Sequence, residues 1–196
     1  MAKIIVTGAS RGIGLEAVRF LLEEGHEVVA ISRTESPLQG ADLPLLRSVC
    51  IDLADSNFEP LHEIIKDWSH VDALIHNAGA FLNKPFSETS IEDFESIYRV
   101  NVFGVARLTQ ALANKLVSGS HVLGISSMGG IQGSAKFPGL SAYSSSKGAL
   151  ITLFELLAEE YKSVGVAFNT LALGAVNTEM LAKAFPDFVA NVSARQ

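Results

Sequence analysis

A short β-rich run at the start of the chain leads directly into a glycine-rich turn and then into a helical pattern. Lys3-Ile-Ile-Val-Thr7 has the continuous apolar character of a buried strand, and Gly8-Ala-Ser-Arg-Gly12-Ile-Gly14 follows at once. In such a turn the free backbone N–H groups and the positive end of the helix dipole point at one place and favour an anion there. This order of elements predicts an α/β fold with a phosphate-binding turn.

Each glycine of the turn has an expected task. Gly8 permits the tight turn, Gly12 allows close approach of a pyrophosphate, and Gly14 allows close packing of the helix on the strand. Three residues separate the first two glycines and one separates the last two, which differs from the G-x-G-x-x-G spacing. A glycine-rich loop that holds no ligand is the alternative.

Further apolar runs alternate with helical patterns along the whole chain. Continuous apolar strands between helices predict a parallel sheet covered on both faces, and right-handed crossovers favour a Rossmann-type doubly wound sheet with strand order 3-2-1-4-5-6. We found no repeat or linker, so residues 1–196 are expected to form a single domain. The expected strands are 26–31, 47–51, 71–76, 120–125 and 165–173, and the expected helical segments are 58–68, 90–98, 102–116 and 144–162.

Composition excludes several classes of partner. The net charge is −6, from 15 Lys and Arg against 21 Asp and Glu, and no basic cluster appears, which argues against a nucleic acid or an anionic membrane. The N-terminus lacks a signal pattern and no apolar run is long enough to span a bilayer. The single cysteine, Cys50, is expected to be a small buried residue of a cytoplasmic protein. The five histidines lack metal-ligand spacing, so we expect no metal site, and surface or capping roles for them.

Tyr143 and Lys147 stand four positions apart at the start of a long helical stretch. At that spacing two side chains share a helix face, with Cβ atoms roughly 5–6 Å apart. A nearby ammonium favours the phenolate and would lower the pKa of the tyrosine, as a general acid/base near neutral pH requires. A solvated helix face is the alternative reading of the pair alone.

Together with these features, further motifs make the sequence resemble the short-chain dehydrogenase/reductase family in its short single-domain branch. The resemblance covers residues 1–181, nearly the whole chain. It rests on motifs in the family's order: Thr7–Gly14, Asp52, Asn77-Ala-Gly79, Asn101, Ser127, Tyr143, Lys147 and Gly174–Thr178.

The resemblance implies the catalytic residues. Tyr143 would be the acid/base, and Lys147 would lower its pKa and bind the nicotinamide ribose. Ser127 would hold the substrate carbonyl, with Ser126 as the alternative serine. Asn101 would anchor a water in a proton relay to Lys147, although a helix N-cap is its alternative.

The resemblance also implies a nicotinamide cofactor. Asp52 would contact the adenine edge, Asn77–Gly79 would let the cofactor lie close to the fourth strand, and Thr178 would face the carboxamide. A turn aspartate and a helix N-cap are the alternatives for Asp52 and Thr178. The implied cofactor-binding set is Gly8, Ser10, Arg11, Gly12, Ile13, Gly14, Arg33, Asp52, Asn77, Ala78, Gly79, Tyr143, Lys147, Val176 and Thr178.

The end of the second strand favours NADP(H) over NAD(H). An enzyme that uses NAD places an acidic side chain there, but this chain has Ser32-Arg33, and Arg11 lies in the glycine turn. Two guanidinium groups suit a 2′-phosphate. We therefore expect an NADPH-dependent reductase of an aldehyde or ketone, a homodimer through segments 102–116 and 144–162, with a non-catalytic NAD(P)-binding sensor as the alternative.

The sequence departs from the family pattern at four places. His76 replaces a common asparagine, Leu173 replaces a proline before Gly174, and Tyr143 follows Ser127 by sixteen positions, a longer interval than usual. We expect this extra loop to place Phe137 at the rim of a pocket bounded also by Phe81, Leu82, Met180 and Leu181, which suggests an apolar substrate. The fourth departure is at the end: family members usually continue past the Thr178 loop into another helix and a seventh strand, whereas this chain stops at Gln196. We expect either a trimmed form or a sheet with one fewer edge strand.

Overall fold

One parallel sheet organises the protein in a computed structural model that describes residues 1–35, 37–38, 43–55, 57–185 and 189–195. Its six strands lie in the order β3-β2-β1-β4-β5-β6, as the sequence predicts, and every neighbouring pair is parallel. All carboxyl ends of the strands therefore meet at one edge. The strands are β1 (Lys3–Thr7), β2 (Glu27–Ser32), β3 (Leu46–Cys50), β4 (Ala73–His76), β5 (His121–Ser127) and β6 (Ala167–Leu173).

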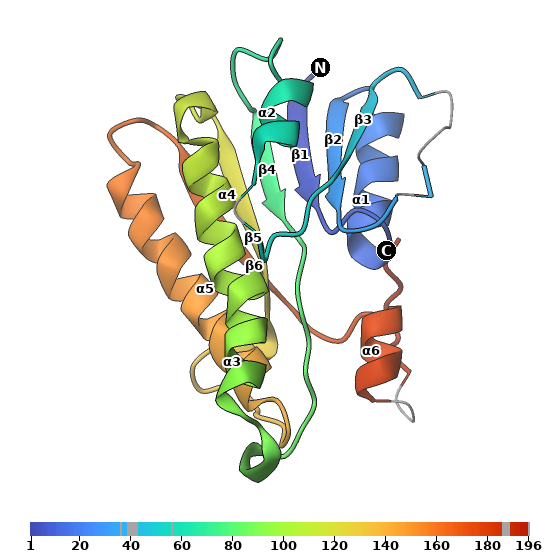
Figure 1. Ribbon diagram of the computed structural model, residues 1–196, viewed down its shortest axis with the longest axis vertical. Helices are drawn as coiled ribbons and strands as arrows, with labels where there is room; N and C mark the ends of the chain where they lie inside the picture. The colour runs from blue at the N-terminus through green and yellow to red at the C-terminus, as the bar shows by residue number, and fades with distance from the viewer. Residues whose placement is uncertain (36, 39–42, 56, 186–188, 196) are drawn as a thin grey trace.

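Helices lie on both faces of the sheet, but on the second face α1 packs mainly on β1 and β2, so the expected cover on both faces is incomplete at β6. Figure 1 shows α3, α4 and α5 side by side in front of the sheet, with α1 behind β2 and β3. The helix α6 lies apart from them, below α1 in this view. The helices are α1 (Gly12–Glu23), α2 (Glu59–Ile64), α3 (Ile91–Tyr98), α4 (Val105–Ala111), α5 (Ser141–Glu160) and α6 (Glu179–Ala184).

Alternating side chains of the strands divide the core into two layers. Ile5 of β1 packs in a large cluster with Leu61 and Leu108, from α2 and α4, whereas its neighbours Ile4 and Val6 pack with Val18 of α1. This division follows from the two-residue period of a strand, because successive side chains point to opposite faces. Burial on both faces explains why β1 and β2 are continuously apolar, whereas β6 alternates and leaves Leu171 49% exposed.

The expected helices 90–98 and 102–116 form one continuous helical stretch. A π-helix (Arg99–Gly104) joins α3 directly to α4, so Asn101 lies inside a helix and is not an N-cap. Helical turns of this wide type are rare and frequently occur at functional sites. Gly104 lets the π-helix approach the backbone at Leu53 closely, since a Cβ atom on Gly104 would lie 2.6 Å from the main-chain oxygen of Leu53.

Two local expectations are wrong. Cys50 is exposed, because β3 is an edge strand of the sheet. His76 is neither a surface nor a capping residue; it is fully buried in β4. The short helix α6 follows the Thr178 loop, and no seventh strand pairs with the sheet among the described residues. No helix in the described part of the chain is both long and apolar enough to cross a membrane.

Candidate active site

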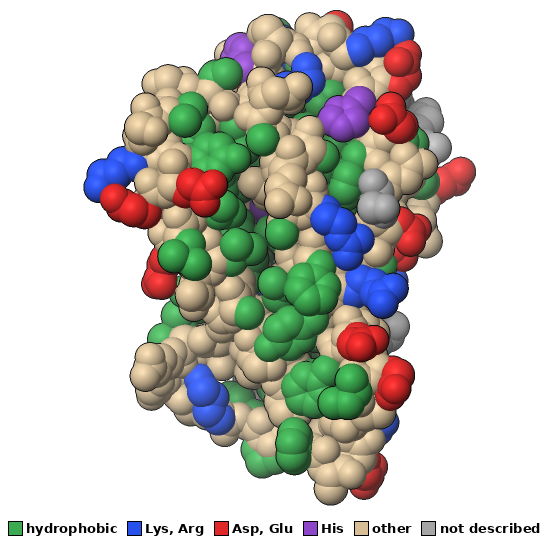
Figure 2. Space-filling model, turned by 60° about the vertical axis from the view of Figure 1, so that its left-hand side comes forward, with side chains coloured by type: hydrophobic (Ala, Val, Ile, Leu, Met, Phe, Trp, Pro, Cys, Tyr) green, Lys and Arg blue, Asp and Glu red, His purple; other side chains and the backbone are tan. Residues whose placement is uncertain are grey.

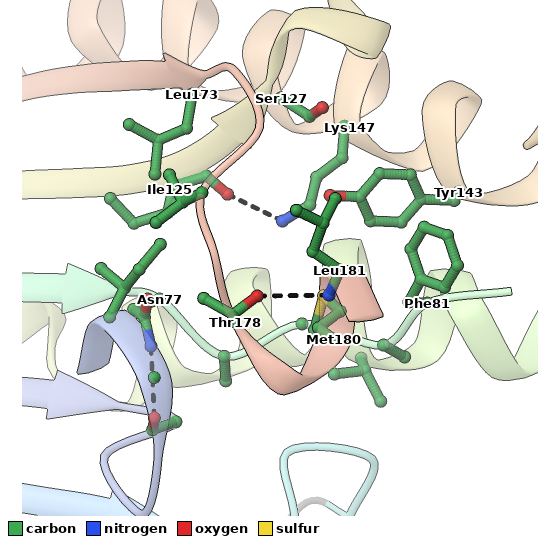
Figure 3. Close-up of a pocket in the computed structure, with 18 of the residues that line it drawn as sticks. Asn77, Phe81, Ile125, Ser127, Tyr143, Lys147, Leu173, Thr178, Met180 and Leu181 are labelled. Atoms are coloured by element: carbon green, nitrogen blue, oxygen red, sulfur yellow. Dashed lines mark hydrogen bonds between the residues drawn. The ribbon is translucent and has the colours of Figure 1, made fainter. Parts of the chain in front are cut away.

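A pocket of about 630 Å³ opens at the carboxyl edge of the sheet. Its lining comes from the ends of all six strands and from α5 and α6, which is the expected ligand position in a doubly wound sheet. Figure 3 shows that Tyr143, Lys147 and Ser127 lie together on one side of this pocket, across from Asn77 and the glycine turn. The structure thus brings together the motifs that the sequence separates by more than 100 residues.

The glycine turn depends on having no side chains at two positions. Gly8 has a φ of 68°, which L-residues with a Cβ rarely adopt. A Cβ on Gly14 would lie 2.3 Å from both the Asn77 amide nitrogen and the Gly8 oxygen. Gly14 therefore allows the start of α1 to pack on the turn and on the end of β4, rather than on a strand alone.

Asn77 fastens the turn to the sheet. Its side-chain amide donates hydrogen bonds to the main-chain oxygens of Thr7 and Gly8, at 3.0 and 3.2 Å. The main-chain N–H groups of Asn77 and Ala78 in turn donate to the Thr7 hydroxyl. Since these bonds occupy the side-chain amide group, Asn77 holds Gly8 in position at the edge of the pocket.

The N-terminus of α1 fits an anion. Arg11 occupies the N-cap position in extended backbone, and no side chain caps the helix. No side chain therefore satisfies the first N–H groups of α1, and Gly12 and Ile13, at the start of this helix, line the pocket. A turn that a Cβ would fill, followed by an uncapped helix, suits the pyrophosphate of a dinucleotide.

Two arginines lie at the end of the pocket next to β2. Arg33 directly follows β2 and is exposed, and Arg11 is exposed in the glycine turn; both line the pocket. The Arg11 guanidinium lies 3.5 Å from the Glu179 carboxylate, so the turn is bridged to α6. No hydrogen bond or ion pair of Arg33 is found within the described residues, and it is the freer of the two cations.

Asp52 and Thr178 line the pocket but also have local structural roles. Asp52 Oδ1 accepts a hydrogen bond from the Ala54 N–H, which is the expected turn alternative. Thr178 is the N-cap of α6, its hydroxyl oxygen accepting from the Leu181 N–H, as Figure 3 shows. Its hydroxyl proton remains available for donation into the pocket.

Tyr143 projects from the first turns of α5 into the pocket. Its ring packs at 4.8 Å, between ring centres, against Phe81. Burial raises the pKa of Tyr143 above 10.0, and the neighbouring Ser127 hydroxyl acts in the opposite direction. The expectation of a lowered pKa for Tyr143 is therefore wrong for this arrangement, because burial outweighs the effect of the neighbouring groups.

Lys147 shares a helix face with Tyr143 but directs its ammonium elsewhere. The Nζ atom donates a 2.7 Å hydrogen bond to the Ile125 oxygen of β5 and lies 5.9 Å from the centre of the Tyr143 ring. Burial lowers the pKa of Lys147 to about 8, because the ammonium is removed from water without a carboxylate beside it. The lysine lies beneath Tyr143 and not in solvent.

Ser127, rather than Ser126, faces the pocket interior. The Ser126 hydroxyl is buried and donates to the Lys147 main-chain oxygen, so it is used to join β5 to α5. The Ser127 oxygen accepts from the Gly129 N–H, so this bond does not use the hydroxyl proton, and the hydroxyl also interacts with Tyr143. Ser127 and Tyr143 thus offer two hydroxyl donors on the same side of the pocket.

Asn101 links the π-helix to the loop that follows β4. Its side chain accepts from the Ala80 N–H at 2.7 Å and donates to the Ala80 oxygen and to the Ser146 hydroxyl. A Cβ on Gly79 would lie 3.5 Å from both the Asn101 amide oxygen and the Lys147 ammonium nitrogen. Asn101 and Lys147 therefore approach each other over Gly79, although they are far apart in sequence.

Sequence reasoning missed several side chains around the site. Leu82 does not line the pocket, whereas Phe185, Met128 and Leu140 do. Phe185 packs edge-on against Phe137, with 6.3 Å between ring centres, and no periodic pattern in the sequence predicts this contact.

The groups of three or more His, Cys, Asp or Glu side chains that a metal ion needs are absent from the described residues. Among the remaining predicted site residues, Ser10, Gly12, Ile13, Ala78, Gly79 and Val176 all line the pocket.

Comparisons with known proteins agree with this geometry. The family model for short chain dehydrogenases matches residues 2–188. Carbonyl reductase [NADPH] 2 of Sus scrofa is 32% identical over 180 residues, covering 91% of this chain and 73% of the relative. L-xylulose reductase of Homo sapiens is 31% identical over the same shares of the two chains.

Solved structures agree as well. A short chain dehydrogenase from Shigella flexneri 2a strain 301, crystallised with NADP, superposes with a TM-score of 0.88 at 28% identity, covering 99% of this chain and 86% of that chain. One from Salmonella enterica serovar Typhi gives 0.86 at 29% identity, covering 96% and 82%. With the sheet order, the glycine turn and the Tyr143–Lys147 pair in place, the chain belongs to the short-chain dehydrogenase/reductase family of oxidoreductases.

Proposed function

We propose that the protein reduces an aldehyde or ketone to an alcohol with NADPH. The observation that carries the proposal is the placement of the Tyr143 and Ser127 hydroxyls in one pocket, above the buried Lys147 and across from the glycine turn. The relatives named for carbonyl and L-xylulose reduction support the same reaction type.

The chain's residues suit the cofactor in two regions. The glycine turn and the uncapped start of α1 would hold the pyrophosphate, while Arg33 and Arg11 would pair with a 2′-phosphate. NADPH, when bound, supplies the hydride that adds to the carbonyl carbon and is thereby oxidised to NADP⁺. The name of the Sus scrofa relative and the NADP complex of the Shigella protein support this cofactor.

The protonated state of Tyr143 suits reduction. Burial makes the phenol a weaker acid, but it also keeps the proton in place at neutral pH, so Tyr143 can donate it to the carbonyl oxygen as the C=O π bond breaks. Ser127 would donate a hydrogen bond to the same oxygen and stabilise its developing charge. Lys147 would stabilise the tyrosinate left behind, and Asn101 would hold the groups around it.

Pocket-directed mutagenesis tests the proposal. NADPH oxidation at 340 nm with a panel of aldehydes and diketones should show turnover that Tyr143→Phe reduces by about 10²–10⁴-fold, the usual contribution of a general acid. Tyr161→Phe is the matched control, since Tyr161 packs on Phe168 outside the pocket. NADPH binding that persists without turnover in the wild type would favour a non-catalytic sensor instead.

A homodimer is the oligomeric state that we propose. Phe103 of the π-helix and Leu156 of α5 are large apolar side chains that are 51% and 64% exposed. They belong to the two segments in which the sequence shows apolar residues on more than one face. Sedimentation at micromolar concentration should give twice the monomer mass, and Leu156→Glu should shift it to the monomer.

A further inference from the structure

The substrate half of the pocket is apolar among the described residues. The charged side chains of the lining, Arg11, Arg33 and Asp52, lie at the glycine turn and beyond β2 and β3, apart from the buried Lys147. Besides Ser127, Lys147 and Thr178, the lining includes six large apolar side chains: Phe81, Phe137, Leu140, Met180, Leu181 and Phe185.

Aromatic rings lie on two sides of this half. Phe81 packs against the Tyr143 ring at a tilt of 57°, so it covers one side of the proposed acid. At the rim, Phe137 of the β5–α5 loop meets Phe185, which follows α6, edge-on. Phe137 is nevertheless 59% exposed, and an exposed aromatic ring at the rim of a pocket has much apolar area that a ligand can cover. Figure 2 shows hydrophobic side chains gathered along the middle of one face of the molecule.

Polar groups near Tyr143 suffice for one oxygen atom. The Ser127 oxygen already accepts from Gly129, so Ser127 and Tyr143 each have one proton to donate. Lys136 directly precedes the rim residue Phe137. Its ammonium donates to the oxygens of Gly129, Ile131 and Ser134 within the same loop. The Lys147 ammonium is already held by the Ile125 oxygen, and the Thr178 hydroxyl is one further donor. A substrate carboxylate, or several hydroxyls, would therefore lose more hydrogen bonds to water than these side chains replace. Each such loss lowers affinity by roughly one order of magnitude or more.

We propose that the substrate is a neutral ketone or aldehyde with an aromatic or similarly bulky apolar group beside the carbonyl. The carbonyl oxygen meets Tyr143 and Ser127, and the apolar group lies between Phe81 and the Phe137–Phe185 pair. This inference rests on the proposed function, because it places the reacting carbonyl at Tyr143.

Four probes separate the substrate class from the activity itself. They are 1-phenyl-1,2-propanedione (neutral and aromatic), phenylglyoxylate (aromatic and anionic), D-ribulose (neutral and polyhydroxylated) and 2,3-butanedione (small). With NADPH, kcat/KM for the neutral aromatic diketone should exceed that for phenylglyoxylate and ribulose by about 100-fold or more, the upper range for differences in pocket fit. Equal or better turnover of either polar probe would overturn the proposal.

A variant at the rim locates the apolar group. Phe137→Ala should lower kcat/KM for the aromatic diketone by about 10-fold or more relative to 2,3-butanedione. Phe86→Ala is the matched control, because Phe86 is also exposed but packs on Phe94 outside the pocket. A ratio that is the same in both variants and the wild type would contradict the placement at Phe137.

Binding without the cofactor gives a second readout. Saturation-transfer NMR on the protein alone should label the ring protons of the aromatic diketone and should weaken in Phe137→Ala. If none of the four probes is reduced, the proposed function fails, and the NMR experiment still decides the substrate class. Transfer to ribulose as strong as that to the aromatic diketone would then overturn the inference.

Discussion

The ammonium of Lys147 donates a 2.7 Å hydrogen bond to the main-chain oxygen of Ile125 and so ties α5 to the end of β5. The lysine is 4% exposed, and no carboxylate pairs with it among the described residues. Its positive charge is therefore held in the pocket floor at a cost in free energy, which binding of an anionic cofactor or formation of a tyrosinate would offset.

The buried Lys147 should make the free energy of unfolding increase with pH. Its pKa is about 8 in the folded protein but near 10.5 when unfolded, so between these values the unfolded chain binds more protons. The destabilisation is fully present below pH 8 and is relieved as the pH rises toward 10.5. Over this range the free energy of unfolding should increase by about 3 kcal/mol. Urea unfolding of the cofactor-free protein at pH 7.5, 8.5 and 9.5 measures it.

Lys147→Met removes this titrating group and should flatten the dependence on pH. Lys162 follows the end of α5, is exposed and pairs with Glu159. Lys162→Met should therefore leave the pH dependence of the free energy of unfolding as in the wild type. Parallel slopes for wild type and Lys147→Met would show that Lys147 is solvated in the folded protein.

Arg33 should decide between the two nicotinamide cofactors. Arg33→Asp replaces a cation that lines the pocket after β2 by an anion, which should repel a 2′-phosphate. We expect the apparent KM for NADPH to rise by about 10-fold or more, as loss of a charged hydrogen bond predicts, with little change for NADH. Arg19→Asp, in a charged pair on the outer face of α1, is the control. An unchanged KM for NADPH would assign the phosphate to Arg11 alone.

Glu179 should compete with the cofactor for Arg11. Its carboxylate lies 3.5 Å from the Arg11 guanidinium, and both side chains are more than half exposed. Glu179→Gln removes the competing charge, so the Kd of NADPH should fall by about two- to five-fold, the modest effect of a surface pair, while that of NADH stays constant. Calorimetric titration at low salt checks this. Tighter binding of both cofactors alike would instead indicate a general effect on α6.

Much of the fold was predictable because its signals are local. The alternation of apolar strands and helices fixes a parallel sheet, and chirality then leaves few strand orders, so β1 to β6 were placed in the correct order. The join of α3 to α4 was not predictable, since it depends on Asn101 bonding across to Ala80 and on Gly104 meeting Leu53. Those contacts are between segments about 20 to 50 residues apart.

The motifs predict side chains that the structure brings together, but not their energetics. Tyr143, Lys147 and Ser127 line the same pocket, whereas Asn101 is fully buried beside it, and the direction of the Tyr143 pKa depends on how deeply the ring is buried. Similarly, a spacing of four residues could not reveal that Lys147 turns toward Ile125. Both outcomes are set by tertiary packing, which a motif does not encode.

His76 should make the protein sensitive to acid. Its ring is fully buried and lies edge-on to Phe154, and burial lowers its pKa to about 3. The Thr109 hydroxyl donates to the Val105 oxygen and therefore accepts from His76 Nε2–H, while the buried Nδ1 finds no partner among the described residues. The neutral ring thus carries its proton on Nε2.

The unfolded chain protonates His76 near pH 6.5, whereas the folded protein does so only near pH 3. As pH falls through this window, the unfolded state gains the proton first, so the free energy of unfolding decreases by about 2 kcal/mol between pH 7 and 5. His76→Gln keeps a donor for Thr109 but cannot titrate, and its loss over the same interval should be smaller by that amount. His62→Gln on α2 serves as the control, and urea unfolding at pH 7, 6 and 5 compares the three proteins. Equal losses in wild type and His76→Gln would mean that the folded protein admits a proton to this ring, in which case the core around β4 opens to water well above pH 3.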